Sequence, residues 1–244
     1  MIAEIVRALE NQSFDFKEGE RNVVVIGTTG SGKSTLINWL NGCKLRPLTP
    51  AEKSALGLDF DAVCVDSKGP KSEVCDIGHG NVSRTQSVKK VPIDGTSFVI
   101  WDFPGFFDTG GPTTEIIHAA VLSKFMNDPL SSGMILMVTT QEPDLAASRG
   151  QGISQVIERI ANIFGGDSMR MKLDGIVFCL TKPVQLTKSS YGKHIHSALT
   201  KKWEQVGSEF NNVVFDPFNK VKHKMTQKEM LDIFGRDNTH TGQV

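Results

Sequence analysis

The chain has 244 residues, of which 39% are hydrophobic and 22% are charged. At about 150 residues per domain, this length predicts one large domain or one and a half. The apolar fraction is sufficient for a sizeable core and excludes a disordered or fibrous chain. The 27 Lys and Arg residues balance the 27 Asp and Glu residues, so no global field draws the protein toward nucleic acid or an anionic membrane.

The cellular setting follows from the apolar runs and the cysteines. No apolar run approaches the ~20 residues that a membrane-spanning helix requires. Residues 1–18 carry four acidic side chains and lack a basic start followed by an apolar stretch, so we expect no secretory signal. The four cysteines include no CxxC pair, which favours free thiols in a reducing, cytoplasmic setting.

Strand-length apolar runs alternate with helix-length amphipathic stretches, the pattern of a mostly parallel sheet covered by helices. Asp94-Gly95 predicts a tight antiparallel hairpin, because this pair tolerates the positive φ angles of a two-residue turn. The irregular stretch 45–80 predicts a long, mobile loop with one short strand at 62–65, and we expect 236–244 to be disordered or cut from a longer protein. The other expected strands are 22–26, 87–93, 96–101, 133–138, 174–180 and 212–215, and the expected helices are 34–40, 113–126, 152–164, 190–210 and 226–234.

The sequence Gly27-Thr-Thr-Gly30-Ser31-Gly32-Lys33-Ser34 fully matches the phosphate-loop pattern GxxxxGKS/T, between an expected strand and an expected helix. Its glycines let main-chain N–H groups turn toward phosphate oxygens, and the helix adds its positive N-terminal dipole. Lys33 would place a charge on the β- and γ-phosphates, and Ser34 would place a hydroxyl on Mg²⁺. The motif predicts a nucleoside triphosphate bound by Gly27, Thr28, Thr29, Gly30, Ser31, Gly32, Lys33, Ser34 and Thr35.

A second element begins where strand 96–101 ends, in Asp102-Phe-Pro-Gly105. A carboxylate at the end of a strand beside a phosphate loop lies near the metal ion, usually through a water molecule. In a DxxG sequence, the glycine N–H can meet the γ-phosphate, which makes the following loop sensitive to hydrolysis. We therefore expect Asp102 in the metal site, and Gly105 beside Lys33 in nucleotide binding and catalysis.

The run Gly-Thr-Thr-Gly-Ser-Gly-Lys-Ser-Thr-Leu-Ile-Asn, with Asp-Phe-Pro-Gly-Phe-Phe-Asp-Thr at 102–109, resembles the G domains of septins and immunity-associated GTPases. The resemblance implies a three-layer Ras-like G domain, an α/β fold with a mostly parallel sheet, one antiparallel hairpin strand and helices on both faces. It also implies GTP/GDP and Mg²⁺ as cofactors and nucleotide-dependent dimers. The expected division is an N-terminal helical extension (1–21), the G domain (22–219) and a C-terminal helix and tail (220–244).

Two positions around the γ-phosphate bear on hydrolysis. Phe106 stands where Ras-like GTPases carry the glutamine that orients the attacking water, so intrinsic hydrolysis should be slow; the resembled families are also apolar there. A threonine ahead of the hairpin normally completes the Mg²⁺ shell, and Thr85 is the candidate for this metal-binding and catalytic role. Ser83 is the second candidate, and a plain loop residue is the alternative. Arg84 is either an arginine finger or, more simply, a solvated side chain.

Recognition of the base departs from the family pattern NKxD or TKxD, whose aspartate selects guanine. Here the strand ends in Thr181-Lys182-Pro-Val184, so Thr181 and Lys182 fit and Val184 replaces the aspartate. Asp216, after the last strand, is a candidate substitute. The resemblance favours GTP over ATP, and ATP stays open as the alternative.

Three function classes remain. The leading one is a GTPase switch that hydrolyses slowly and forms a homodimer across the nucleotide face, read by an unknown protein effector. The second is an assembly module with negligible turnover. The third is a P-loop ATPase or kinase, disfavoured because Phe103 follows Asp102 where transporter ATPases carry glutamate. The lysine-rich stretch 188–202 is read as a solvated face; a peripheral membrane contact there has no further support, and no specific nucleic acid is expected.

Overall fold

The computed structural model of the chain describes residues 2–79, 87–105, 111–131, 133–141, 173–182, 210–214 and 226–235. Its elements, in chain order, are α1 (Ile2–Asn11), β1 (Arg21–Gly27), α2 (Lys33–Leu40), β2 (Leu45–Pro47), α3 (Pro50–Ala55), β3 (Val63–Val65), β4 (Lys89–Pro92), β5 (Phe98–Asp102), α4 (Pro112–Asn127), β6 (Met134–Gln141), β7 (Leu173–Thr181), β8 (Phe210–Val214) and α9 (Gln227–Gly235).

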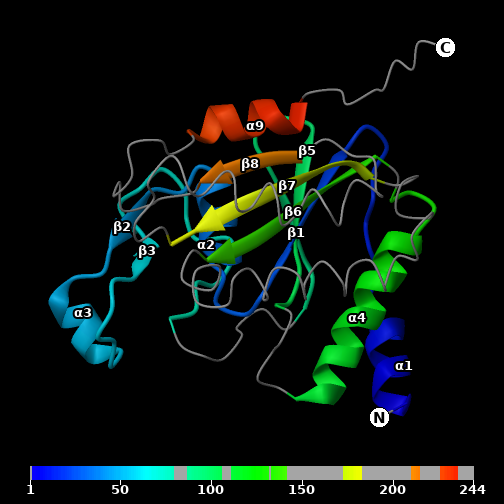
Figure 1. Cartoon of the computed structure of the whole chain (residues 1–244), viewed down its shortest axis with the longest axis horizontal. Helices are drawn as coiled ribbons and strands as arrows, with labels where there is room; N and C mark the ends of the chain where they lie inside the picture. The colour runs from blue at the N-terminus through cyan, green and yellow to red at the C-terminus, as the bar shows by residue number, and fades with distance from the viewer. Residues whose placement is uncertain are drawn as a thin grey trace.

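The main sheet has six strands in the order β4-β5-β1-β6-β7-β8 (Figure 1). β4 is antiparallel to β5, as the Asp94-Gly95 turn predicts, and the other neighbouring strands run parallel. β1 lies at the centre, with Val23 opposite Ile100 on β5 and Ile135 on β6. A central parallel strand is covered on both faces, which explains why β1 is a continuous Val and Ile run rather than an alternating one.

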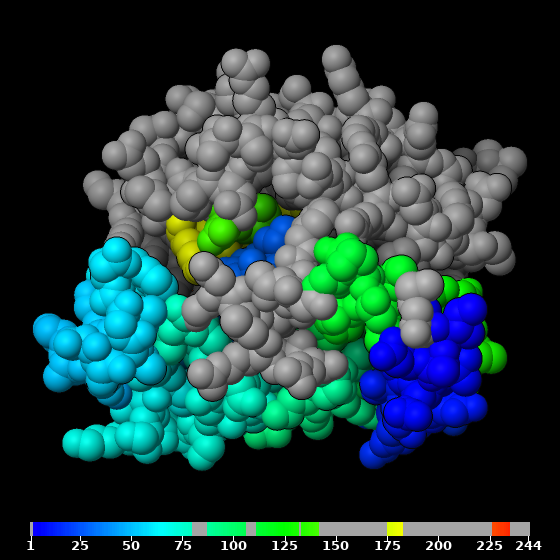
Figure 2. All heavy atoms as spheres, turned by 90° about the horizontal axis from the view of Figure 1, so that it is seen from below, coloured from blue at the N-terminus to red at the C-terminus, as the bar shows by residue number. Residues whose placement is uncertain are grey.

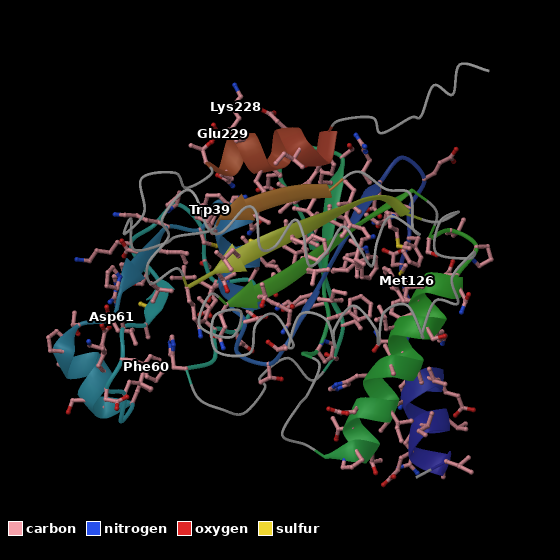
Figure 3. The ribbon with its side chains drawn as sticks, in the orientation of Figure 1. Trp39, Phe60, Asp61, Met126, Lys228 and Glu229 are labelled. Atoms are coloured by element: carbon pink, nitrogen blue, oxygen red, sulfur yellow. The ribbon has the colours of Figure 1, made fainter. Side chains whose placement is uncertain are left out.

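Helices cover both faces of the sheet, which gives three layers (Figure 1). On one face, α2 and α9 bury Leu36, Ile37 and Phe234 against the odd-numbered residues of β1. On the other face, α4 buries Phe125 and its neighbours against the even-numbered residues of β1 and against β5. Lys228 and Glu229 project from the outer side of α9 (Figure 3), so this helix is amphipathic. The expected fold class, a three-layer Ras-like G domain, is confirmed.

The N-terminal segment folds back onto α4. Helix α1 lies beside α4 (Figure 1). After α1, the rings of Phe14 and Phe16 pack edge-on or tilted against Trp101 and Phe125. The Lys124 ammonium donates to the carbonyl oxygens of Leu9 at 2.5 Å and Gln12 at 2.7 Å. A lysine at the C-terminal end of a helix satisfies carbonyl oxygens that have no N–H donor within the helix, and its charge complements the negative end of the helix dipole.

The short strand expected at 62–65 is present as β3, but the expectation that the rest of 45–80 is a long loop is wrong. β2 and β3 form a two-stranded antiparallel ribbon, and α3 lies between them in the chain. α3 has a full capping box, in which Thr49 accepts from the Glu52 N–H and Glu52 accepts from the Thr49 N–H, with Pro50 in the first turn. The signature Thr-Pro-x-Glu was readable in the sequence, but the helix is too short to show an amphipathic period.

Other boundaries shift by one or a few residues. β8 begins at Phe210, whereas the sequence pattern predicts a helix, 190–210, that ends at this residue. The remainder of that stretch and the expected helix 152–164 lie outside the described residues. Among the described residues, no helix combines the length and the apolar character that crossing a bilayer requires.

Candidate nucleotide-binding site

The phosphate-loop sequence forms the turn between β1 and α2. Gly30 and Gly32 have φ angles of 79° and 84°, in the left-handed region that glycine adopts without strain. Gly32 is the N-cap of α2, and no side chain among the described residues caps it. The first N–H groups of a helix have no acceptor within the helix, so the start of α2 favours an anion in the loop.

Gly27, the first glycine of the motif, serves close packing. A β-carbon added to Gly27 would lie 2.3 Å from the hydroxyl oxygen of Thr139 and 2.4 Å from its carbonyl oxygen. Such distances are far below van der Waals contact, so any side chain at Gly27 would push the loop away from β6. The glycine therefore permits the loop to start directly against the neighbouring strand.

Two threonines at the ends of neighbouring strands hold the loop. The hydroxyl oxygens of Ser31 and Thr139 are 2.7 Å apart, and Thr139 donates to the Ile26 carbonyl at 3.1 Å. Since a hydroxyl has one proton, Ser31 is then the donor to Thr139. The Thr181 hydroxyl donates to the Ser31 carbonyl at 2.6 Å and lies 3.2 Å from the Thr140 carbonyl. These bonds fix the loop to the ends of β6 and β7.

Lys33 lies within the loop and is almost fully buried. Its ammonium donates to the Thr28 carbonyl at 3.0 Å and to the Gly27 carbonyl at 3.4 Å. The hydroxyls of Thr28 and Thr29 are buried and have no hydrogen-bond partner in the described part of the chain. A buried polar group without a partner costs about 1–3 kcal/mol, so a polar ligand that satisfies these hydroxyls would stabilise the loop.

Asp102 ends β5 beside the start of α2, and its side chain is 1% exposed. The Ser34 hydroxyl donates to Asp102 Oδ2 at 3.3 Å. Burial raises the pKa of Asp102, while the Lys33 charge and hydrogen bonds from Cys75 and Ser34 oppose that rise. Asp102 Oδ1 is buried and has no hydrogen-bond partner among the described residues.

The Ser34 and Asp102 pair fits Mg²⁺. This cation prefers oxygen ligands in octahedral geometry and retains several waters. A hydroxyl and a carboxylate stand side by side here, and the unpartnered Oδ1 of Asp102 is the atom that a metal-bound water would satisfy. The donor set therefore suits a cation held directly by Ser34 and through water by Asp102.

Gly105 lies directly against the phosphate loop. A β-carbon added to Gly105 would be 2.7 Å from the Thr29 hydroxyl oxygen and 2.8 Å from the Thr29 nitrogen. The DxxG segment and the loop thus meet at two positions, Ser34 with Asp102 and Thr29 with Gly105. The structure thus brings the predicted nucleotide-binding residues 27–35 and Gly105 together with Asp102, which was predicted as a metal ligand.

The end of β7 completes the described part of the site. Lys182 is exposed, and its φ of 49° is the one positive value of a non-glycine residue in the described ranges. Such backbone conformations cost of order 1 kcal/mol or more and cluster at functional sites. Figure 2 shows a hollow in which the blue of the β1–α2 turn, the green of β6 and the yellow of β7 are exposed together.

Several predicted residues cannot be placed against this site. Thr85, Ser83, Arg84, Phe106, Val184 and Asp216 lie outside the described residues. Two further side chains contact the site and belong to no motif. Thr139, which bonds to Ser31, was signalled only by a polar pair at the end of an apolar strand. Asn38, which donates to the Ser34 carbonyl at 2.9 Å, was signalled only by a polar position on the buried side of α2.

A scan of protein-family models and a search of curated proteins found no match. Solved structures do resemble the chain. A single-residue variant of SsGBP has a TM-score of 0.53 and 12% identity, over 91% of this chain and 58% of that protein, so the chain spans less than two thirds of its length. A dimerization-deficient mutant of Toc33 from Arabidopsis thaliana has a TM-score of 0.49 and 15% identity, over 91% and 79%. The signal recognition particle receptor SRb-GTP/SRX complex from Chaetomium thermophilum has a TM-score of 0.48 and 15% identity, over 92% and 100%.

At 12% identity, the similarity to SsGBP establishes a shared fold. The strand order and the glycine loop between β1 and α2 agree with it. The chain therefore has the fold of a Ras-like G domain, with the phosphate-loop sequence in the turn between β1 and α2.

Proposed function

We propose that the protein binds GTP with Mg²⁺ and hydrolyses it slowly, so that the bound nucleotide acts as a switch. The observation that supports this most is the Ser34 and Asp102 pair beside Lys33, with Asp102 Oδ1 buried and unpartnered within the described residues. In this proposal, Lys33 neutralises the β- and γ-phosphates, Ser34 and Asp102 hold the metal, and the Gly105 N–H meets the γ-phosphate. Thr85 completes the metal shell when the triphosphate is bound.

The preference for guanine rests on the family resemblance and on two residues. Lys182 stands exposed at the end of β7, where its stem would cover the plane of the base. Thr181 supports the site indirectly, because its buried hydroxyl is used on the Ser31 carbonyl. Val184 offers no carboxylate for the guanine N1 and N2 groups, so discrimination against adenine is expected to be weaker than an aspartate would provide.

A competition experiment tests the proposal. Unlabelled GTP, GDP, ATP and ADP would compete with a fluorescent guanine nucleotide in the presence of Mg²⁺, and we expect the guanine nucleotides to displace it at the lowest concentrations. Displacement by ATP at lower concentrations than GTP would overturn the assignment to GTP. Lys33→Ala should abolish binding, while Lys44→Ala, which removes an exposed partner of Asp66, should leave it unchanged.

The expected homodimer across the nucleotide face is part of the same proposal. Phe106 cannot orient water, so a second copy would be the source of a positioning group. Single-turnover hydrolysis that rises with protein concentration would support a dimer-activated GTPase. A flat rate near zero would favour the alternative, an assembly module in which the nucleotide sets an interface without being turned over; Phe106 and Val184 are the residues that favour it.

A further inference from the structure

Two hydroxyl oxygens of the phosphate loop, those of Thr28 and Thr29, are buried and have no hydrogen-bond partner within the described part of the chain. By contrast, the hydroxyls of Ser31 and Ser34 in the same motif lie 2.7 and 3.3 Å from polar side-chain atoms of β6 and β5. A hydroxyl that is removed from water costs free energy unless a new partner replaces the lost hydrogen bond. The two threonine hydroxyls are therefore the groups that a bound ligand would satisfy.

The position of Gly105 distinguishes Thr29 from Thr28. The three atoms that a β-carbon on Gly105 would meet first all belong to Thr29, and the first of them is its hydroxyl oxygen, at 2.7 Å. Thr28 is engaged with Lys33 instead, because the Lys33 ammonium donates to the Thr28 carbonyl at 3.0 Å. The Thr29 hydroxyl therefore lies where the phosphate loop meets the segment that follows β5.

We infer that Thr29 determines the preference for a triphosphate, with its hydroxyl donating to an oxygen of the γ-phosphate. The inference rests on the proposed function, in which the Gly105 N–H meets the same phosphate group. Because the Thr29 hydroxyl lies beside Gly105, a phosphate held by that N–H also satisfies the hydroxyl. A hydrogen bond to a charged phosphate oxygen is stronger than one between neutral groups. A diphosphate lacks this phosphate group and leaves the hydroxyl without a partner.

The thermal stability of the nucleotide-free protein gives a first measurement. Removing a hydroxyl that bonds within the protein lowers Tm, whereas removing a buried hydroxyl without a partner does not. After nucleotide is removed with EDTA, Thr29→Val should therefore have a Tm equal to or above that of the native protein. Thr96→Val is the matched control, because it removes a hydroxyl that donates to the Ile93 carbonyl at 2.9 Å away from the site, and it should lower Tm.

The binding test compares Thr29→Val, which keeps the branched shape without the hydroxyl, with Thr29→Ser, which keeps the hydroxyl. Thr28→Val is measured beside them, because it removes the neighbouring buried hydroxyl. The readout is the Kd for GDP divided by the Kd for a non-hydrolysable GTP analogue, both with Mg²⁺. We expect Thr29→Val to lower this ratio about tenfold through the triphosphate alone. In Thr29→Ser and Thr28→Val, the ratio should stay within about twofold of the native value.

Each other outcome contradicts the inference. A native ratio in Thr29→Val overturns it and leaves the proposed function standing. An equal fall of the ratio in Thr29→Ser would assign Thr29 to packing against Gly105, and a selective fall in Thr28→Val would move the contact to that residue.

Two further results also overturn the inference. A loss of Tm in Thr29→Val as large as that in Thr96→Val would show that the Thr29 hydroxyl is bonded within the protein. If the native protein binds no triphosphate, the proposed function fails and the inference fails with it. Should Thr29→Val not fold, Thr29→Ala must show the same selective loss of triphosphate affinity for the inference to stand.

Discussion

Gly105 and Thr29 are in direct contact across the nucleotide site. A β-carbon on Gly105 would lie 2.7 Å from the Thr29 hydroxyl oxygen, 2.8 Å from the Thr29 nitrogen and 2.9 Å from its α-carbon. Two of these three atoms belong to the main chain, so no side-chain rotation relieves the contact. The segment after β5 can therefore approach the phosphate loop only because residue 105 has no side chain.

Gly105→Ala is expected to separate these two segments. The added methyl group forces them apart by several tenths of an ångström, which costs about 1–3 kcal/mol where packing is tight. Because the Gly105 N–H is proposed to meet the γ-phosphate, affinity for a triphosphate should fall about tenfold and affinity for a diphosphate about twofold. Titration of the variant with fluorescent GTP and GDP analogues measures both constants.

Gly95→Ala provides the comparison for this variant. Gly95 has a φ of 74° in the β4–β5 turn, and open space surrounds it, so alanine strains the backbone without touching the site. It should lower Tm and leave both affinities unchanged. Equal loss of GDP and GTP binding in Gly105→Ala would remove the glycine from the γ-phosphate position.

Thr181→Val tests whether the end of β7 shapes the loop. Valine has a similar volume but leaves the Ser31 carbonyl without its 2.6 Å donor. A buried carbonyl deprived of its partner costs about 1–3 kcal/mol, and the loop carries that cost in every nucleotide state. We expect affinities for GTP and GDP to fall by the same factor, about tenfold.

The control for Thr181→Val is Thr96→Val. The Thr96 hydroxyl donates to the Ile93 carbonyl at 2.9 Å in the β4–β5 turn, so the same kind of bond is lost away from the site. It should reduce stability and leave nucleotide binding unchanged. A fall in GTP affinity that exceeds the fall in GDP affinity would mean that Thr181 acts on the γ-phosphate rather than on the loop.

Local chemistry explains why so much of the fold could be predicted. The Val and Ile run of β1 and the Asp94-Gly95 turn each favour one local conformation, and the glycines before Lys33 permit the positive φ angles that the loop requires. Ser34 and Asp102 could be paired in advance because each belongs to a motif. The phosphate-loop pattern places Ser34 at the metal, and the DxxG pattern places Asp102 at the end of a strand beside the loop. These predictions concern residues whose partners are implied by their own motif.

The hydrogen bonds of Asn38 to the main chain of Val74 and Cys75 could not be predicted for the opposite reason. Asn38 and Cys75 are 37 positions apart, and their contact depends on how the segment after β3 returns to α2. Neither residue belongs to a pattern, and a polar residue on a buried helix face has many partners open to it. Helix α3 was not predicted because its six residues are too few to show a helical period of apolar positions, although Thr49 and Glu52 form its capping box.

Thr85→Ala addresses a residue outside the described ranges. If Thr85 completes the metal shell only with a triphosphate, alanine should weaken Mg²⁺–GTP binding about tenfold and leave GDP binding within about twofold. Ser83→Ala, two positions earlier, is measured beside it because Ser83 is the second candidate for the same role. Equal losses of both nucleotides in Thr85→Ala would remove this residue from the metal shell, and a selective loss in Ser83→Ala would assign the role to Ser83.

Glu52→Gln is expected to give a pH-dependent change in Tm. The Arg46 guanidinium, at 2.6 and 2.8 Å, and the Thr49 N–H and hydroxyl lower the pKa of Glu52 from 4.5 to about 2. A carboxyl whose pKa is lowered on folding adds stability above its unfolded pKa and loses that contribution as pH falls through its folded pKa. The variant should therefore have a Tm about 1–3 °C below the native protein at pH 7, with the difference shrinking between pH 4.5 and 2.

The double variant with Arg46→Gln separates the ion pair from the helix cap. Glutamine at 52 still accepts from the Thr49 N–H, so the capping box is kept and only the charge interaction is lost. In the Arg46→Gln background, the second change should have a smaller effect at pH 7 than it has alone. A Tm difference that stays constant down to pH 2, or the same effect in both backgrounds, would show that the guanidinium contributes nothing to the stability of the β2–α3 segment.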